Sequence, residues 1–133
     1  MLARMKWSAR AGLVVSLLAG FVADYPWGDW VGHSHWARVG WIPFVSGPVT
    51  LPDIAQNLLL FAPVGVFSTL AFARRPVAWA VGLTAPVSLL GEWTQVYSHA
   101  RFPSATDFAC NVAGASASAW LCRHYFRVAA QSR

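Results

Sequence analysis

Residues 53–73 read DIAQNLLLFAPVGVFSTLAFA, and this stretch decides the fold. The twenty residues after Asp53 carry no charged side chain, and most of them are apolar. A helix needs about 20 mostly apolar residues to cross the hydrocarbon core of a bilayer. The stretch therefore predicts a membrane-spanning helix that begins with a small polar cluster.

Three further stretches resemble this one in length and apolar character, at 7–23, 76–93 and 107–122. The whole chain of 133 residues is 56% hydrophobic and only 11% charged, whereas a typical soluble domain has about 25% charged residues. So few charges cannot cover a soluble surface, and so many apolar residues exclude a disordered chain. We therefore expect an all-α membrane protein: one four-transmembrane-helix bundle over residues 1–133, with residues 24–52 as an outer interfacial loop.

The charged residues sort to two sides of such a bundle. With the N-terminus in the cytoplasm, eight bases and no acid fall inside, while all five acids and two bases fall outside. Because basic loops stay on the cytoplasmic side, we expect both termini in the cytoplasm of a bacterial-type inner membrane. The inner bases are Arg4, Lys6, Arg10, Arg74, Arg75, Arg123, Arg127 and Arg133; the outer ones are Arg38 and Arg101.

Two properties of the chain invite other interpretations. Residues 7–23 have the basic start and apolar run of a signal peptide, but small residues are badly spaced for cleavage, so we expect an uncleaved anchor. The net charge of +5 could indicate nucleic-acid binding, but no Lys/Arg cluster is interleaved with a soluble fold. We therefore expect membrane lipids, and no nucleic acid, as partners.

A short motif occurs twice, at the start of the second and of the fourth stretch. Both read D-x-A-x-N, from Asp53 to Asn57 and from Asp107 to Asn111. Two parallel helical hairpins would produce this repetition. Each Asp could simply cap a helix start, but capping does not explain the two Asn residues a turn deeper, where polar groups are costly in a membrane.

Glu92 lies near the end of the third stretch, where the helix dipole disfavours an anion. Gln95 follows on the same face, and Arg101 comes soon after. Two interpretations are compatible: a Glu92–Arg101 salt bridge, or a pocket rim organised around Arg101.

Seven polar residues from three segments thus fall within about two turns of the outer boundary. We expect them to form a ligand-binding site beneath the outer interface, with no metal and no cofactor assigned. His33 and His35 are expected to make interfacial polar contacts, with a ligand role less favoured, and His99 lies beside the site. The seven residues are Asp53, Asn57, Glu92, Gln95, Arg101, Asp107 and Asn111.

These residues also carry a family resemblance. The chain resembles the VanZ-like proteins, named for a teicoplanin-resistance protein. The match runs in order over about 60% of the chain. Trp41 stands where the family often has Asn, and Ser118 where it often has Gly. The matching pieces are Ile42-Pro43-Phe44, Asp53-x3-Asn57-x3-Phe61-x-Pro63-x-Gly65, Glu92-x2-Gln95, Arg101 and Asp107-x3-Asn111-x2-Gly114.

The resemblance implies a small multi-pass envelope protein with a role in envelope homeostasis or antibiotic tolerance. We expect a protein that binds a lipid-linked envelope precursor or a glycopeptide-type amphiphile at the outer leaflet. Arg101 would contact a phosphate or carboxylate group.

Two alternatives remain. Asp53, Glu92 and Asp107 could hold a divalent metal in an enzyme that acts on a lipid phosphate, although no known catalytic motif is present. The polar layer could also serve only bundle assembly, with the protein as part of a larger complex.

Overall fold

The computed structural model describes residues 2–46 and 49–132, with side chains from Lys6 onward. The side chain of Arg4 and the whole of Arg133 lie outside the described residues. The part of the charge argument that rests on these two bases therefore stays a prediction.

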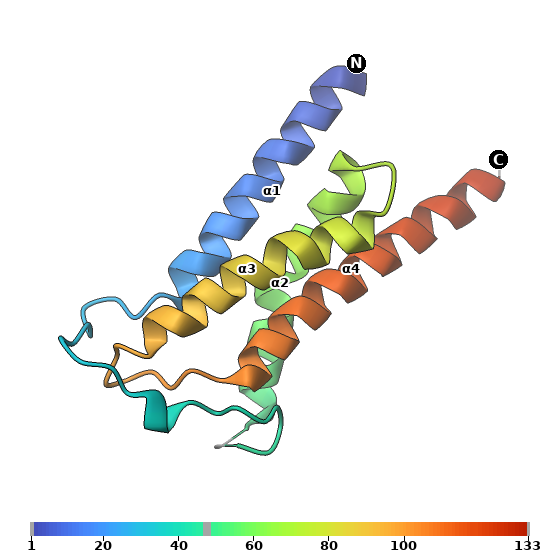
Figure 1. The fold of residues 1–133 in the computed structure, drawn as a ribbon. Helices are drawn as coiled ribbons and strands as arrows, with labels where there is room; N and C mark the ends of the chain where they lie inside the picture. Colours follow the sequence, from blue (N-terminus) through green and yellow to red (C-terminus); the bar gives the residue numbers. More distant parts are fainter. Residues whose placement is uncertain (1, 47–48, 133) are drawn as a thin grey trace.

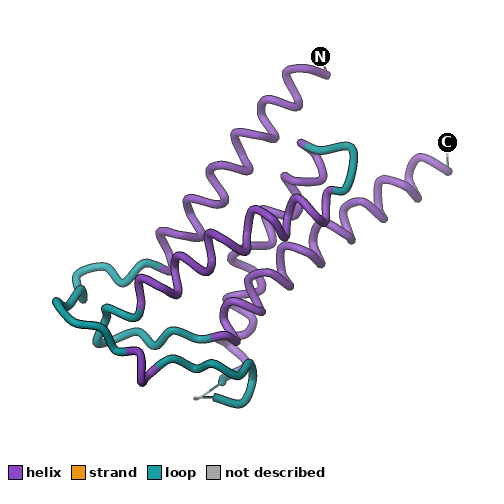
Figure 2. The backbone as a smooth tube through the Cα atoms, viewed as in Figure 1, coloured by secondary structure: helices purple, strands orange, loops and turns teal. Residues whose placement is uncertain are grey.

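The described residues form four α-helices and no strands, which confirms the all-helical prediction. A single 3-10 turn, η1 (Trp36–Arg38), lies in the long loop between the first two helices (Figures 1 and 2). The four helices are α1 (Leu2–Asp24), α2 (Leu51–Ala71), α3 (Pro76–Gln95) and α4 (Ala105–Gln131).

The helix bounds differ from the expected spans mainly at the chain ends. α4 continues for nine residues beyond Cys122, to Gln131. The expected end was set by where the sequence stops being apolar, but residues 123–131 contain no Gly or Pro that would end a helix. α2 and α3 also continue through the prolines in their interiors, Pro63 and Pro86.

Two of the helices are long and apolar enough to cross a membrane, by length and composition. They are the Lys6–Asp24 part of α1 and the whole of α2. This finding supports two spans. Four spans with both termini in the cytoplasm stay a prediction.

The helices alternate in direction. Both termini and the short α2–α3 turn lie at one end of the bundle, and the long loop and the α3–α4 connection lie at the other (Figure 1). α2 and α4 are therefore parallel, and their D-x-A-x-N segments begin at the same end. This arrangement brings residues more than fifty positions apart into one region.

The most extensive helix interface joins α2 to α4, because small residues let the two backbones approach closely. A Cβ on Gly114 would collide with the Leu58 carbonyl, and one on Gly65 would collide with the backbone of α4. Ser118 Oγ also donates to the Ala62 carbonyl at 2.7 Å. Gly114 and Ser118, small residues four positions apart, thus let α4 pack closely on α2.

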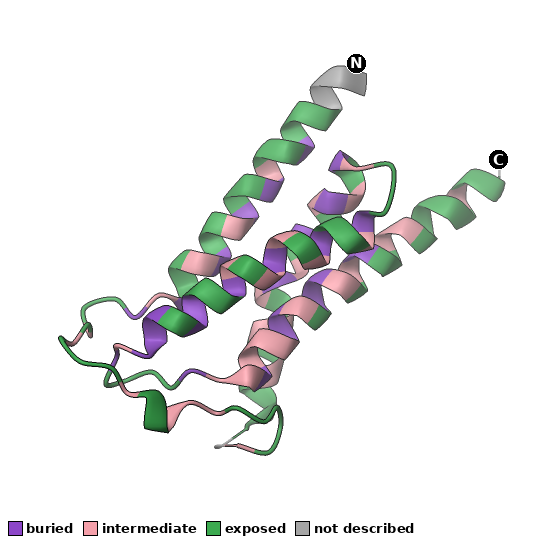
Figure 3. Cartoon of the chain, viewed as in Figure 1, coloured by how far each residue is buried: buried purple, intermediate pink, exposed green. Residues whose placement is uncertain are grey.

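The buried faces of the helices turn toward one another, and the outward faces are exposed (Figure 3). Phe61 and Val64 of α2 form the centre of the core and are completely buried. All eight Trp side chains are exposed, by 47% to 70%. Such an apolar exterior is unusual for a soluble monomer.

The long loop is fastened along its length to the α3–α4 connection. The amide of Val31 donates to the Tyr97 carbonyl at 2.8 Å, and the amide of Ala105 donates to the Gly40 carbonyl at 2.8 Å. Trp30 stacks on Tyr97, with ring centroids 5.2 Å apart. The loop therefore covers the end of the bundle instead of extending away from it.

Candidate functional site

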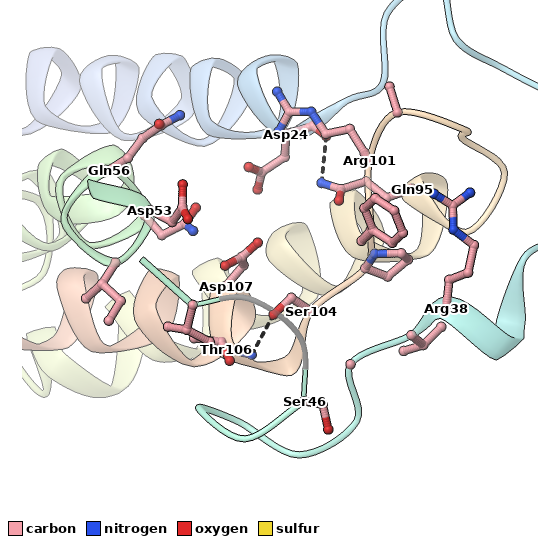
Figure 4. Close-up of a pocket in the computed structure, with 18 of the residues that line it drawn as sticks. Asp24, Arg38, Ser46, Asp53, Gln56, Gln95, Arg101, Ser104, Thr106 and Asp107 are labelled. Atoms are coloured by element: carbon pink, nitrogen blue, oxygen red, sulfur yellow. Dashed lines mark hydrogen bonds between the residues drawn. The ribbon is translucent and has the colours of Figure 1, made fainter. Parts of the chain in front are cut away.

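A cavity of about 650 Å³ opens at the covered end of the bundle. Its walls come from the end of α1, the start of α2, the long loop, and the α3–α4 connection with the start of α4 (Figure 4). Five of the seven residues expected from the sequence line it: Asp53, Asn57, Gln95, Arg101 and Asp107.

Neither Asp53 nor Asp107 is an N-cap. The caps are Thr50, whose hydroxyl accepts from the Asp53 amide at 3.3 Å, and Ser104, whose hydroxyl accepts from the Thr106 amide at 3.1 Å. Each Asp thus occupies the third helical position, where the dipole favours a carboxylate. The N-cap interpretation of the two Asp residues is therefore wrong by three positions. Both residues line the cavity, and Asp53 Oδ2 also accepts from the Thr50 hydroxyl at 2.5 Å.

A third carboxylate, that of Asp24, reaches the same cavity from the end of α1. In Figure 4 the carboxylates of Asp24, Asp53 and Asp107 turn toward a common space. Asp24 is only 5% exposed, and its Oδ2 accepts from Asn111 Nδ2 at 3.4 Å. The sequence reasoning missed this residue, although an acid at the C-terminal end of an apolar helix was a usable signal.

Glu92 and Asn111 lie behind the cavity wall. Glu92 Oε2 accepts from the Ser104 amide at 2.6 Å, which ties α3 to the start of α4. Asn111 is fully buried and donates to Ser88 Oγ at 3.0 Å. Glu92 Oε1 and Asn111 Oδ1 are buried without a hydrogen-bond partner among the described residues. The structure therefore places these two residues as supports of the wall and not on its surface.

Gln95 connects the end of α3 to the end of α1. Its Nε2 donates to the Asp24 carbonyl at 3.0 Å, and the side chain is 3% exposed. This bond fixes the backbone of Asp24 where the carboxylate enters the cavity. Gln95 thus acts on the site by positioning another residue.

Two guanidinium groups line the cavity. Arg101, which the sequence predicted, is exposed, and its Nη2 donates to the Ala23 carbonyl at 3.4 Å. Arg38, which the sequence reasoning left out, lies over the Phe102 ring at 3.9 Å and donates to the His99 carbonyl at 2.8 Å.

The hydrogen bonds of Glu92 and Arg101 go to separate backbone groups, on Ser104 and Ala23. The side chains of Glu92 and Arg101 are therefore held by these backbone contacts and not by the predicted salt bridge between them. Arg101 keeps most of its five donors available to a ligand.

The cavity combines three carboxylates with two guanidinium groups. Carboxylates accept hydrogen bonds from hydroxyl or amine groups, while a guanidinium binds a phosphate or carboxylate through paired donors. Its chemistry suits a head group that carries both an anionic part and hydrogen-bond donors. The carboxylate oxygens could also hold a divalent cation.

The fold and cavity define a small all-helical protein with an apolar exterior and a polar chamber at one end. The family model described as VanZ/LLP1 matches residues 9–127, and the chain belongs to this family. It is therefore a small protein associated with the membrane of the cell envelope. Comparison with curated proteins and with solved structures gave no match.

Proposed function

We propose that this protein spans the bacterial cytoplasmic membrane four times and binds an amphiphile of the cell envelope in its polar cavity, at the outer leaflet. The ligand class is a lipid-linked envelope precursor, or a glycopeptide-type amphiphile with similar polar groups. The observation that carries the proposal is the cavity itself, which joins guanidinium and carboxylate groups beside an apolar exterior.

Charge placement supports the proposed orientation. Lys6, Arg10, the Arg74–Arg75 turn and the basic end of α4 lie at the end of the bundle that holds both termini. All five acids lie at the opposite end, with the cavity. Basic segments face the cytoplasm, so the cavity would open outward.

The balance of charges in the cavity favours a particular ligand chemistry. Three carboxylates would repel a bare phosphate, but Arg38 and Arg101 offset most of that charge. A phosphate next to a sugar or peptide part would use both kinds of group. The exposed Trp residues of the loop, such as Trp36 and Trp41, would lie beside the lipid part.

Binding to the purified full chain in lipid nanodiscs tests this proposal. Native mass spectrometry would compare polyprenyl phosphate with a polyprenyl phosphate that carries a sugar, so that the two ligands have the same number of phosphate groups. We expect Arg101→Gln to weaken both ligands about tenfold or more, through loss of a charge-assisted contact. The matched control Arg127→Gln, on α4 at the other end, should leave binding unchanged.

Asp107→Asn distinguishes the contribution of the phosphate group to binding from that of the sugar. It should strengthen binding of the bare phosphate, because one repulsive charge is removed, and weaken binding of the sugar-bearing ligand. No saturable binding of either ligand, or equal binding by wild type and Arg101→Gln, would refute the proposal.

A second candidate function is a metal-dependent enzyme that acts on a lipid phosphate. The presence of three carboxylates, from Asp24, Asp53 and Asp107, in the lining of one cavity favours it, since oxygen ligands suit Mg²⁺ or Mn²⁺. Here Asp24 takes the place that the sequence had given to Glu92. Phosphate release that requires Mg²⁺ or Mn²⁺ and is lost in Asp53→Asn would establish this function, and its absence across a panel of lipid phosphates would refute it.

A further inference from the structure

Three histidines from two distant segments converge beside the cavity, outside its lining. His33 and His35 come from the long loop, and His99 comes from the α3–α4 connection. The ring centroids are 4.7 Å apart for His33–His35, 4.8 Å for His35–His99 and 5.6 Å for His33–His99. One nitrogen from each ring lies within 4.8 Å of the other two.

Backbone hydrogen bonds hold the two segments in this register. The His35 amide donates to the Val96 carbonyl at 2.8 Å, and an antiparallel bridge joins Trp30 to Ser98. His33 and His35 are two positions apart in the loop, and the 4.7 Å between their ring centroids shows that both side chains reach the same point. The framework therefore presents three imidazoles to one point without help from a ligand.

A second observation concerns the hydrogen bonding of the His35 ring. Its Nε2 is buried and has no hydrogen-bond partner within the described ranges, 2–46 and 49–132. An unsatisfied buried nitrogen costs about 1–3 kcal/mol, and coordination to a metal ion would satisfy it.

Asp29 strengthens the turn that carries His99. Its Oδ2 accepts from Ser98 Oγ and, at 2.5 Å, from the Ala100 amide. These two donors flank His99 on both sides. Arg38 Nη2 also donates to the His99 carbonyl at 2.8 Å, so the backbone of His99 is fixed while its ring stays exposed.

We propose that His33, His35 and His99 form a binding site for a divalent transition-metal ion, with Zn²⁺ as the expected occupant. Three neutral imidazoles without a carboxylate or thiolate suit Zn²⁺, Ni²⁺ and Cu²⁺ and disfavour Mg²⁺ and Ca²⁺. Tetrahedral Zn²⁺ with bonds of about 2.0–2.1 Å needs its ligand nitrogens about 3.3 Å apart. Rotation of the exposed His33 and His99 rings can close the remaining distance.

Such a site would fasten the loop over the cavity to the α3–α4 connection. Its fourth coordination position would remain open to water or to a donor group of a ligand. The proposal does not depend on the amphiphile-binding function, because none of the three histidines lines the cavity.

Zn²⁺ titration of the full chain, with any purification tag removed, tests this site. We expect one ion per chain with a dissociation constant below about 10 µM, measured by competition with a chromogenic chelator. Bound Co²⁺ should show the visible absorption of a tetrahedral site. Zn²⁺ should also raise the unfolding temperature, because a ligand that binds only the folded state stabilises it.

Two of the three proposed metal-binding histidines, His33 and His99, are exposed, so they can be replaced without loss of the fold. His33→Gln and His99→Gln should each weaken Zn²⁺ binding at least tenfold and remove the thermal shift. The control His124→Gln, on the exposed end of α4, should behave as wild type. Less than one saturable ion per chain, or wild-type affinity in both His33→Gln and His99→Gln, would overturn the proposal.

Discussion

Asp24, Asp53 and Asp107 show how three residues of one type reach a common point by different routes. Asp53 and Asp107 each stand at the third position of a helix whose cap is Thr50 or Ser104. Asp24 ends its helix, and its backbone carbonyl accepts a hydrogen bond from the Gln95 side chain. The repeated D-x-A-x-N motif predicted the first two, but nothing in the motif points to the third.

Isosteric changes at Asp107 and Glu92 separate function from assembly. Asp107→Asn and Glu92→Gln each preserve shape and at least one acceptor oxygen, so we expect membrane insertion and thermal stability to stay nearly unchanged. Binding of the sugar-bearing lipid should fall about tenfold for Asp107→Asn. Loss of folded protein on size-exclusion chromatography in both variants would favour a purely structural role for the polar layer.

Asp29 predicts a pH dependence of loop stability. Hydrogen bonds from the Ser98 hydroxyl and the Ala100 amide lower the pKa of Asp29 below its ordinary value of 3.8. A lowered pKa means that the contribution to stability is complete above pH 3.8 and is lost as the pH falls through the folded value.

Asp29→Asn tests this dependence by protease protection of the loop. The variant should be cut faster than wild type at pH 7, and the difference should shrink toward pH 3 in a test with an acid-active protease. A constant difference across this range would contradict the assignment. Asp53→Asn, which does not touch the 29–35 segment, is the control.

At the scale of helices, the α2–α4 pair depends on small residues. Gly114→Val would push a side chain into the Leu58 backbone, and overpacking of this kind costs about 1–3 kcal/mol. Ala113→Val, one residue earlier on the exposed side of α4, places the same group outside the interface. Thermal unfolding in detergent should be lowered clearly by the first variant and little by the second, and equal effects would contradict the packing.

The number and type of helices could be predicted from the sequence, because long apolar runs define them. The end of α4 could not, because apolarity marks where a membrane would end and not where a helix does. Arg38 was missed for a different reason. Its place beside Phe102 depends on how the long loop folds back over the bundle, and no local pattern encodes that contact.

At the scale of the whole molecule, the structure separates a basic end from a polar, acidic end. Single cysteines introduced after replacement of Cys110 and Cys122 test the proposed orientation. Ser34→Cys in the long loop should react with an impermeant maleimide in intact cells, whereas Ala73→Cys in the α2–α3 turn should react only after permeabilisation. The reverse pattern would contradict an outward-facing cavity.

The central claim is that this cavity holds an envelope amphiphile, and crosslinking in cells tests it most directly. A photoreactive amino acid at Gln56, which lines the cavity, would be compared with one at Leu59, which is 70% exposed on the same helix outside the cavity lining. We predict that mass spectrometry finds a polyprenyl-phosphate-containing or glycopeptide adduct at position 56 and only bulk phospholipid at position 59. The same bulk phospholipid adducts at both positions would contradict the account.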